Sequence, residues 1–163
     1  MKKKGKSERE VIVLLYNIRS THNVGSMFRT ADALGVRKIY LSGYSPTPTD
    51  QYGKMRQDIE KVALGTEKTV AWEYVKTPEQ TINKFKESKY QIIGLEQSKN
   101  SIDYKKVKAG KKVLFIVGNE VEGISKKILS LCDKVTEIPM KGNKESLNVS
   151  VAFGVALFRI INL

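Results

Sequence analysis

The sequence predicts an α/β domain with a mainly parallel sheet and flanking helices. Short apolar runs of strand length, such as residues 11–16 and 112–117, alternate with segments that have helical signals. Continuous apolar runs of this kind suit strands that are buried on both faces, as in parallel sheets. Strands that alternate with helices along a chain define the α/β class. A chain of 163 residues is long enough for one domain with a sizeable core.

In the first part of the chain, the predicted elements have clear boundary signals. Asn23 can cap the first helix, Gly35 and Gly65 can end the first two helices, and Thr77 and Pro78 start the third. A long turn-rich loop over residues 44–53 is of a kind that is often functional. The expected strands cover residues 11–16, 38–42, 69–75 and 91–95, and the expected helices cover residues 24–34, 56–64 and 79–89.

The last part of the chain is predicted to contain two more strands and two more helices. The strands cover residues 112–117 and 135–138, and Ser125 can cap a short helix that ends at residue 131. Residues 146–161 are apolar nearly all round, which predicts a helix buried on most sides.

The charge balance points to a polyanionic partner. There are 29 Lys and Arg residues against 17 Asp and Glu, giving a net charge of +12. Such a protein attracts polyanions, of which nucleic acid is the commonest in cells, although a lysine-rich solvated surface is the alternative. We expect residues 1–10 to form a flexible basic arm that contacts RNA, ahead of a single domain over residues 11–163. The RNA contacts of the arm are assigned to Lys2, Lys3 and Lys4.

Several classes of protein are excluded or disfavoured. Cys132 is the only cysteine, which excludes a disulfide scaffold, and we expect it to be a small core residue. His22 is the only histidine, so a zinc site or a His-dependent catalytic triad is not expected, and no metal is predicted. The longest apolar stretch is too short to cross a bilayer, and the basic N-terminus Met-Lys-Lys-Lys-Gly-Lys is not followed by the apolar h-region of a secretory signal. We therefore expect a cytoplasmic protein with no membrane association.

Three polar clusters follow the ends of predicted strands, where ligands bind in open α/β sheets. The first cluster, residues 17–31, contains Asn23 and Arg29, and Arg29 projects from a helix that is otherwise apolar. An arginine in that setting is costly unless it meets an anion, although an ordinary ion pair at the rim is the alternative. The second cluster, residues 115–124, contains Gly118, which allows a ligand to approach the backbone, and Glu120, which can orient a cationic group. A simple glycine turn is the alternative there.

The third cluster, residues 138–152, opens the apolar C-terminal helix. Ser146 and Asn148 can cap that helix, but together with Glu145 and Ser150 they exceed what one cap requires. The free N–H groups at a helix start also favour a polar ligand.

In this order, the three clusters resemble the three motifs of the SpoU (TrmH-like) branch of the SPOUT RNA methyltransferases. Asn-x-Gly-x-x-x-Arg-Thr-Ala matches the first motif and Gly-x-Glu-x-x-Gly matches the second. Ile-Pro-Met followed by Ser-Leu-Asn-Val-Ser matches the third. The resemblance runs from about Asn17 to the C-terminus, and it is similar to a minimal, single-domain form of the family.

The resemblance implies an α/β knot fold, in which the C-terminal region forms a trefoil knot, and a homodimer whose sites lie near the interface. It also implies methyl transfer from S-adenosylmethionine to a ribose 2′-hydroxyl of tRNA or rRNA. The residues that would hold the cofactor are Leu95, Gly118, Ile138, Ser146 and Leu147. The residues that would be catalytic are Asn23, Arg29, Glu120 and Asn148.

The resemblance leaves the role of Arg29 open. Arginine is effectively always protonated, so Arg29 either accepts the hydroxyl proton with help from an RNA phosphate or clamps that phosphate and stabilises the developing alkoxide. Arg19 and Arg29 would also bind RNA. Two other functions are to be distinguished by experiment: a non-catalytic RNA-binding protein that kept the fold, and a small-molecule enzyme that uses the same cofactor.

Overall fold

The structure is a computed structural model that describes residues 9–163. Its seven strands form one sheet in the order β3-β2-β1-β6-β4-β7-β5, and every neighbouring pair is parallel. The predicted α/β class with a mainly parallel sheet is therefore confirmed. The strands are β1 (Glu10–Tyr16), β2 (Lys38–Ser42), β3 (Ala71–Val75), β4 (Gln91–Leu95), β5 (Ile102–Asp103), β6 (Lys112–Val117) and β7 (Lys134–Glu137).

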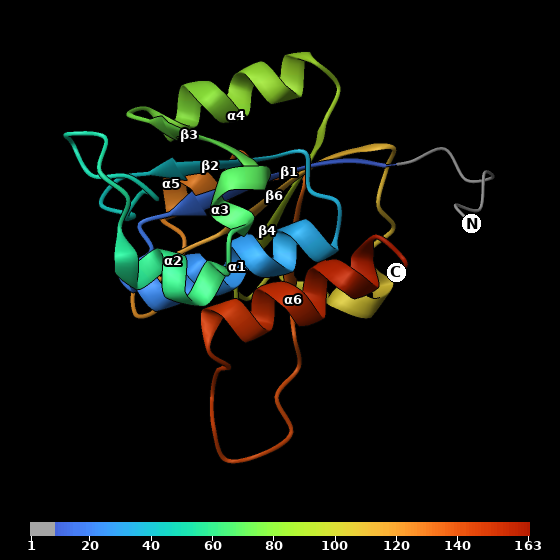
Figure 1. Cartoon of the computed structure of the whole chain (residues 1–163). Coiled ribbons are helices and arrows are strands. Elements are labelled where there is room, and N and C mark those ends of the chain that lie inside the picture. The colour runs from blue at the N-terminus through green and yellow to red at the C-terminus, as the bar shows by residue number, and fades with distance from the viewer. Residues whose placement is uncertain (1–8) are drawn as a thin grey trace, which may run out of the picture.

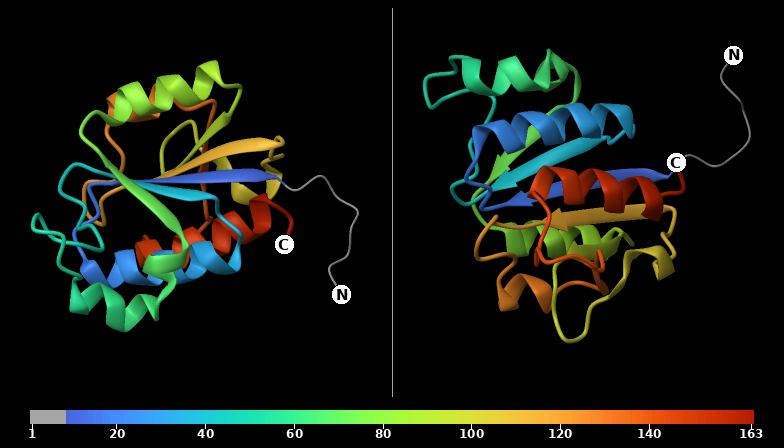
Figure 2. Two further views of the ribbon diagram at one scale, coloured as in Figure 1. Left: turned by 45° about the horizontal axis from the view of Figure 1, so that its top comes forward. Right: turned by 90° about the horizontal axis from the view of Figure 1, so that it is seen from below.

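Helices cover both faces of the sheet (Figures 1 and 2). Helices α4 and α5 lie on one face, and α1, α2 and α6 lie on the other. The helices are α1 (Thr21–Ala33), α2 (Gln57–Ala63), α3 (Thr66–Thr69), α4 (Pro78–Glu87), α5 (Lys126–Leu129), α6 (Val149–Ile160) and the 3₁₀ turn η1 (Tyr104–Lys106). The knot implied by the family resemblance stays a prediction.

The core consists of two apolar layers, one on each face of the sheet. Val13 and Leu15 of β1 point into the layer beneath α1 and α6, while Ile12 and Leu14 point into the layer beneath α4 and α5. All four side chains are at most 4% exposed. This two-sided burial is why residues 11–16 of β1 and 113–117 of β6 are unbroken apolar runs rather than an alternating pattern.

The first helix begins earlier than expected, and its cap is a different residue. The Ser20 hydroxyl accepts a hydrogen bond from the backbone N–H of Asn23 at 3.1 Å, so Ser20 is the N-cap. The prediction that Asn23 caps this helix is wrong, because its side chain makes long-range hydrogen bonds instead. Gly35 follows the helix at φ +65°, as a C-terminal glycine does.

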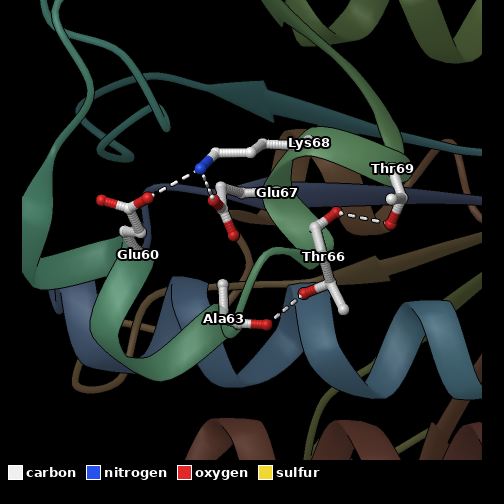
Figure 3. Close-up of polar contacts among 6 residues, drawn as sticks. All are labelled: Glu60, Ala63, Thr66, Glu67, Lys68 and Thr69. Carbon is white, nitrogen blue, oxygen red and sulfur yellow. Dashed lines mark hydrogen bonds and ion pairs between the residues drawn. The ribbon is translucent and has the colours of Figure 1, made fainter.

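The junction between α2 and α3 also differs from the prediction (Figure 3). Gly65, at φ +90°, follows the C-cap residue Leu64 and ends α2 as predicted, but it is also the N-cap of α3, and Thr69 lies in α3 rather than in a strand. Thr66 bridges the two helices by donating a hydrogen bond from its hydroxyl to the Ala63 carbonyl at 2.7 Å. The Glu67 carboxylate is buried here, and its oxygens accept no hydrogen bond from residues 9–163. The nearest cation is Lys68, whose Nζ lies 3.9 Å from Glu67 Oε1 and 2.7 Å from Glu60 Oε1.

The last helix is less buried than its sequence predicts. α6 begins at Val149, not at Ser146, with Asn148 as the N-cap. One face packs on α1 and the sheet, but Val151, Val155 and Phe158 on the other face are 50%, 41% and 37% exposed. The prediction that this helix is buried on most sides is therefore wrong for the single chain.

At the chain ends and near Cys132, the structure refines the remaining predictions. Residues 1–8 of the predicted arm lie outside the described residues, whereas Glu10 already begins β1 and the Arg9 guanidinium donates to the Ile161 carbonyl at 2.7 Å. Cys132 is half-buried against Gly94, and burial raises the pKa of its thiol to about 11. Within residues 9–163, no helix is long and apolar enough to cross a membrane.

Candidate active site

The strand order brings the three predicted clusters to one edge of the sheet. The chain runs outward from β1 through β2 and β3, while β6, β4 and β7 lie on the other side of β1. The boundary between β1 and β6 is therefore a topological switch point, where open α/β sheets bind ligands. The segments that follow β1, β6, β4 and β7 meet there, at the carboxyl ends of the strands.

A cleft of about 560 Å³ lies at this edge. It is lined by all five residues predicted to hold the cofactor, which are Leu95, Gly118, Ile138, Ser146 and Leu147. Glu120 and Asn148, two of the four predicted catalytic residues, also line it. A volume of this size is within the usual range for small-molecule and cofactor sites.

The cleft is acidic although the chain is strongly basic. No lysine or arginine is among the residues that line it, whereas five glutamates are: Glu96, Glu120, Glu122, Glu137 and Glu145. The net charge of the whole chain is +12. A cleft with this lining favours a cationic ligand over an anionic one.

Glu120 is the centre of the polar network at this edge. Its carboxylate accepts hydrogen bonds from the backbone N–H of Arg19 at 3.0 Å, from that of Ser20 at 3.1 Å and from Asn23 Nδ2 at 3.0 Å. Burial by itself raises the pKa of Glu120, but the hydrogen bonds from Arg19, Asn23 and Ser20 together hold it below its ordinary value. Glu120 is therefore an ionised carboxylate that fixes the start of α1.

A chain of side-chain hydrogen bonds joins the three clusters. Asn23, which is 6% exposed, donates to Glu120 and accepts from Asn148 Nδ2 at 3.1 Å. The Asn148 Oδ1 atom accepts from both the backbone N–H of Ser150 at 2.9 Å and its hydroxyl at 2.5 Å. Glu120, Asn23 and Asn148 thus connect the loop after β6, the start of α1 and the start of α6.

Gly118 is required by packing within the protein itself. A Cβ atom built on Gly118 would lie 2.6 Å from the carbonyl carbon and oxygen of Gly123 and 2.7 Å from the Ile124 side chain. The loop after β6 folds back tightly at this point, with Asn119 and Gly123 exchanging backbone hydrogen bonds of 3.2 and 3.0 Å. The sequence-based reason for this glycine, close approach of a ligand, is therefore not needed to explain it.

Glu96 is a site residue that the sequence analysis missed. Its carboxylate accepts hydrogen bonds from the backbone N–H of Ile124 at 2.7 Å and of Gln97 at 2.9 Å, which ties the end of β4 to the loop after β6. Gln97 in turn donates to the Glu145 carbonyl at 2.6 Å. The sequence signal that could have identified Glu96 is its position directly after the predicted strand over residues 91–95.

The segment after β7 has few internal contacts. Residues 141–148 are all exposed, and among residues 9–163 none of their N–H groups donates to a backbone carbonyl. In Figure 1 this segment descends from the body of the protein before it returns to α6. Its N–H groups are therefore available to a ligand in the cleft.

The two arginines predicted to act at the site lie outside the cleft. The backbone of Arg19 contacts Glu120, but its side chain is exposed at the rim. Arg29 is exposed and makes no ion pair with the described residues; it lies in a second hollow between α1, α2 and α6. Ser150 lines that hollow as well and hydrogen-bonds Asn148, so the hollow adjoins the cleft.

A parallel sheet with an acidic cleft at its topological switch point places the chain among α/β proteins that bind a ligand at the carboxyl ends of the strands. The model of the SpoU rRNA Methylase family matches residues 10–158. The chain therefore belongs to the SpoU rRNA methylase family, and the family prediction is confirmed.

Three relatives illustrate this membership. A tRNA (guanosine(18)-2′-O)-methyltransferase of Aquifex aeolicus is 37% identical over 153 residues, which cover 94% of this chain and 69% of that protein. The 23S rRNA (guanosine-2′-O-)-methyltransferase RlmB of Neisseria meningitidis is 33% identical over 93% of this chain, which spans only 58% of that protein. The AdoMet-bound rRNA methyltransferase of Sinorhizobium meliloti is 25% identical with a TM-score of 0.84, and the match covers 95% of this chain and 57% of that one.

Proposed function

We propose that this protein is an S-adenosylmethionine-dependent methyltransferase that modifies a ribose 2′-hydroxyl of tRNA or rRNA. The observation that carries the proposal is the acidic cleft, because the three motif segments meet there in one hydrogen-bonded network. Relatives whose names describe 2′-O-methylation of tRNA and rRNA support the reaction class. The basic surface supports RNA over a small uncharged acceptor.

The volume and the lining of the cleft suit S-adenosylmethionine. When bound, this cofactor supplies a methyl group carried on a positively charged sulfur. The glutamate lining complements its cationic sulfonium and ammonium groups, and Leu95, Ile138 and Leu147 provide apolar contacts for an adenine ring. The free N–H groups of the segment that contains Ser146 provide donors for its polar atoms.

The polar network has a positioning role in this proposal. Glu120 stays ionised and fixes the N-terminus of α1, and Asn23 and Asn148 hold the start of α6 against it. Arg29 would bind the phosphate next to the reacting ribose and stabilise the alkoxide that develops as the hydroxyl proton passes to solvent.

We also propose a homodimer that uses the exposed face of α6. Val151, Val155 and Phe158 form an apolar face that residues 9–163 leave partly exposed, and the small residue Gly154 lies between them. Covering this face with a second copy would bury apolar surface and place Arg29 at the interface, next to the cleft. Light scattering should report a dimer at micromolar concentration. Val155→Asp should give a monomer, and a wild-type monomer with full activity would contradict the proposal.

The cytoplasm is the compartment proposed for this protein, since tRNA and rRNA are the proposed substrates.

Cofactor binding can be tested independently of RNA. Calorimetry should show one S-adenosylmethionine bound per chain. Leu147→Lys, which places a cation at the cleft wall, should weaken this binding at least about tenfold. Leu163→Lys is the matched control, because Leu163 is 72% exposed and lies outside the cleft lining. Equal binding by both variants would remove the cofactor from this cleft.

The reaction is tested by incubating the protein with methyl-labelled S-adenosylmethionine and total tRNA or rRNA. We expect label in the RNA at a position that resists alkaline cleavage, as 2′-O-methylated nucleotides do. Cofactor binding without transfer to any RNA would favour a non-catalytic RNA-binding protein. Transfer to a small molecule but not to RNA would favour the other alternative function.

A further inference from the structure

Three exposed tyrosines lie on segments at the carboxyl ends of β2 and β3, the edge of the sheet that also holds the cleft, and the proposed reaction does not use them. Tyr44, Tyr52 and Tyr74 are 55%, 85% and 46% exposed. Tyr44 and Tyr52 lie on the loop between β2 and α2, and Tyr74 lies near the carboxyl end of β3, which pairs with β2. This loop projects at the left of Figure 1, from the carboxyl ends of the strands. We refer to these three residues as the tyrosine surface.

Two of the three rings are held in place by their hydroxyl groups. The Tyr44 hydroxyl oxygen accepts a hydrogen bond from Asn119 Nδ2 at 2.8 Å, and Asn119 lines the cleft. The Tyr74 hydroxyl donates to the Gly43 carbonyl at 3.0 Å. The Asn17 side chain accepts from the backbone N–H of Tyr44 at 3.3 Å, which fixes the start of the loop. Both residues are about half exposed while their hydroxyl groups are anchored, so little conformational entropy is lost on contact with a partner.

Tyr52 lies at the tip of a closed turn. Asp50 Oδ1 accepts from the backbone N–H of Tyr52 at 2.8 Å and of Lys54 at 2.9 Å. The Asp50 N–H donates to the Lys54 carbonyl at 2.8 Å, and Thr49 pairs with Met55 in an antiparallel bridge. The hydrogen bonds of this turn hold the Tyr52 ring in solvent, although packing of the core does not require an aromatic residue there.

Around the tyrosine surface cations outnumber the one carboxylate of the Tyr52 turn, that of Asp50, in contrast to the glutamate-lined cleft. Arg19, Lys54 and Lys76 are exposed at the same carboxyl-end edge, and their side chains form no ion pair with residues 9–163. The adjacent cleft is lined by glutamates and by no lysine or arginine. A polyanion is therefore attracted to the rim and repelled from the cleft.

We propose that the tyrosine surface binds unpaired nucleotides of the RNA substrate, with bases stacked on Tyr44 and Tyr52 and phosphates near Arg19, Lys54 and Lys76. Aromatic rings interleaved with cations form the combination that binds single-stranded nucleic acid. Duplex bases do not fit, because both faces of a stacked base are already covered by its neighbours. The inference rests on the proposed function and adds to it that the modified ribose lies in or beside an unpaired segment.

The test measures binding of two probes, a labelled 12-nucleotide oligoadenylate and a 12-base-pair RNA duplex, by fluorescence anisotropy. Tyr52→Ala should weaken oligoadenylate binding about 5- to 150-fold, the fold-change that corresponds to one lost base stack. Its affinity for the duplex should stay within about twofold of wild type. Tyr52→Phe, which keeps the ring, is the matched control and should bind like wild type.

A second readout reports stacking directly. Trp72 is the only tryptophan of the chain, so Tyr52→Trp adds one indole at the tip of the loop. Its emission should be quenched when oligoadenylate is added, beyond any change in the wild-type protein. Lys54→Ala should make the affinity for both probes depend less on salt concentration. Lys111→Ala should leave this dependence unchanged, because Lys111 is an exposed lysine at the amino end of β6, on the opposite side of the sheet from the cleft.

Three results would overturn the proposal: unchanged oligoadenylate binding by Tyr52→Ala, an equal loss for both probes, or a changed oligomeric state in that variant. The last result would assign the surface to a protein partner. Failure of the proposed function would look different. In that case the wild-type protein would transfer no methyl group to total RNA, but its binding of oligoadenylate would still depend on the Tyr52 ring.

Discussion

Replacing Glu120 by glutamine tests whether this carboxylate organises the site. Glu120→Gln removes the charge but keeps the size of the side chain, and three donors face that charge: two backbone N–H groups and Asn23 Nδ2. A hydrogen bond to a charged group contributes roughly 1 kcal/mol more than a neutral one. After discounting for the partial exposure of Glu120, we expect a loss of about 2 kcal/mol in the free energy of unfolding at neutral pH. For a domain of this size that corresponds to a drop of about 4–8 °C in Tm.

The same variant has a pH signature. The pKa of Glu120 is lower in the folded protein than its ordinary value of about 4.3. Its contribution to stability is therefore present above that ordinary value and is lost as the pH falls through the folded-state pKa. The difference between wild type and Glu120→Gln should shrink as the pH falls from about 7 to about 3.

Urea denaturation of both proteins across that pH range measures this difference. Glu122→Gln is the matched control, because Glu122 lies in the same loop, is exposed, and its carboxylate accepts no hydrogen bond from the described residues. Equal stability of the two variants at neutral pH would show that the Glu120 carboxylate does not organise the site. A loss of stability in Glu120→Gln that is independent of pH would show the same.

Three further predictions concern packing, catalysis and a buried charge. Gly118→Ala should lower the free energy of unfolding of the ligand-free protein by roughly 1–3 kcal/mol. Gly142→Ala is the control and should not lower it, because Gly142 has open space around it. Equal urea midpoints for the two variants would contradict this prediction. Arg29→Ala and Arg29→Lys should bind S-adenosylmethionine normally by calorimetry but transfer methyl groups at least about 10²-fold more slowly; near-normal turnover in both would remove Arg29 from the reaction. Glu67→Gln, which removes a buried charge that accepts no hydrogen bond from residues 9–163, should raise the free energy of unfolding by roughly 1 kcal/mol, and a lower urea midpoint would show that the charge is compensated.

Local sequence signals were sufficient for most of the fold. The unbroken apolar runs of β1 and β6 identified strands buried on both faces, and Ser125 was correctly identified as the cap of α5, with its hydroxyl accepting from the Ile128 N–H at 3.3 Å. These signals work because burial on both faces and helix capping depend on residues that are near in sequence. The two-residue strand β5, the 3₁₀ turn η1 and the four-residue helix α3 were missed, because such short elements carry no periodicity.

The motif segments, too, were readable from the sequence, and the residues assigned to cofactor binding line one cleft. The strand-end rule places segments that follow parallel strands at one edge of the sheet, so it brought these residues together without side-chain detail. Their roles in binding and catalysis remain predictions, as do the basic arm, the domain boundaries and the knot.

Only the tertiary structure decided how individual side chains are used. Asn23 has the right type and position for a helix cap, but its hydrogen bonds go to Glu120 and Asn148, which lie 97 and 125 residues away in the sequence. Sequence patterns assign a polar side chain to the nearest backbone donor, because partners that are distant in the sequence come within reach only after folding. The apolar composition of α6 likewise predicted burial on most sides, but the sheet and α1 cover one face of the helix and leave Val151 and Val155 exposed. Composition determines that an apolar face needs a partner, and the packing of the whole chain determines whether that partner lies within it.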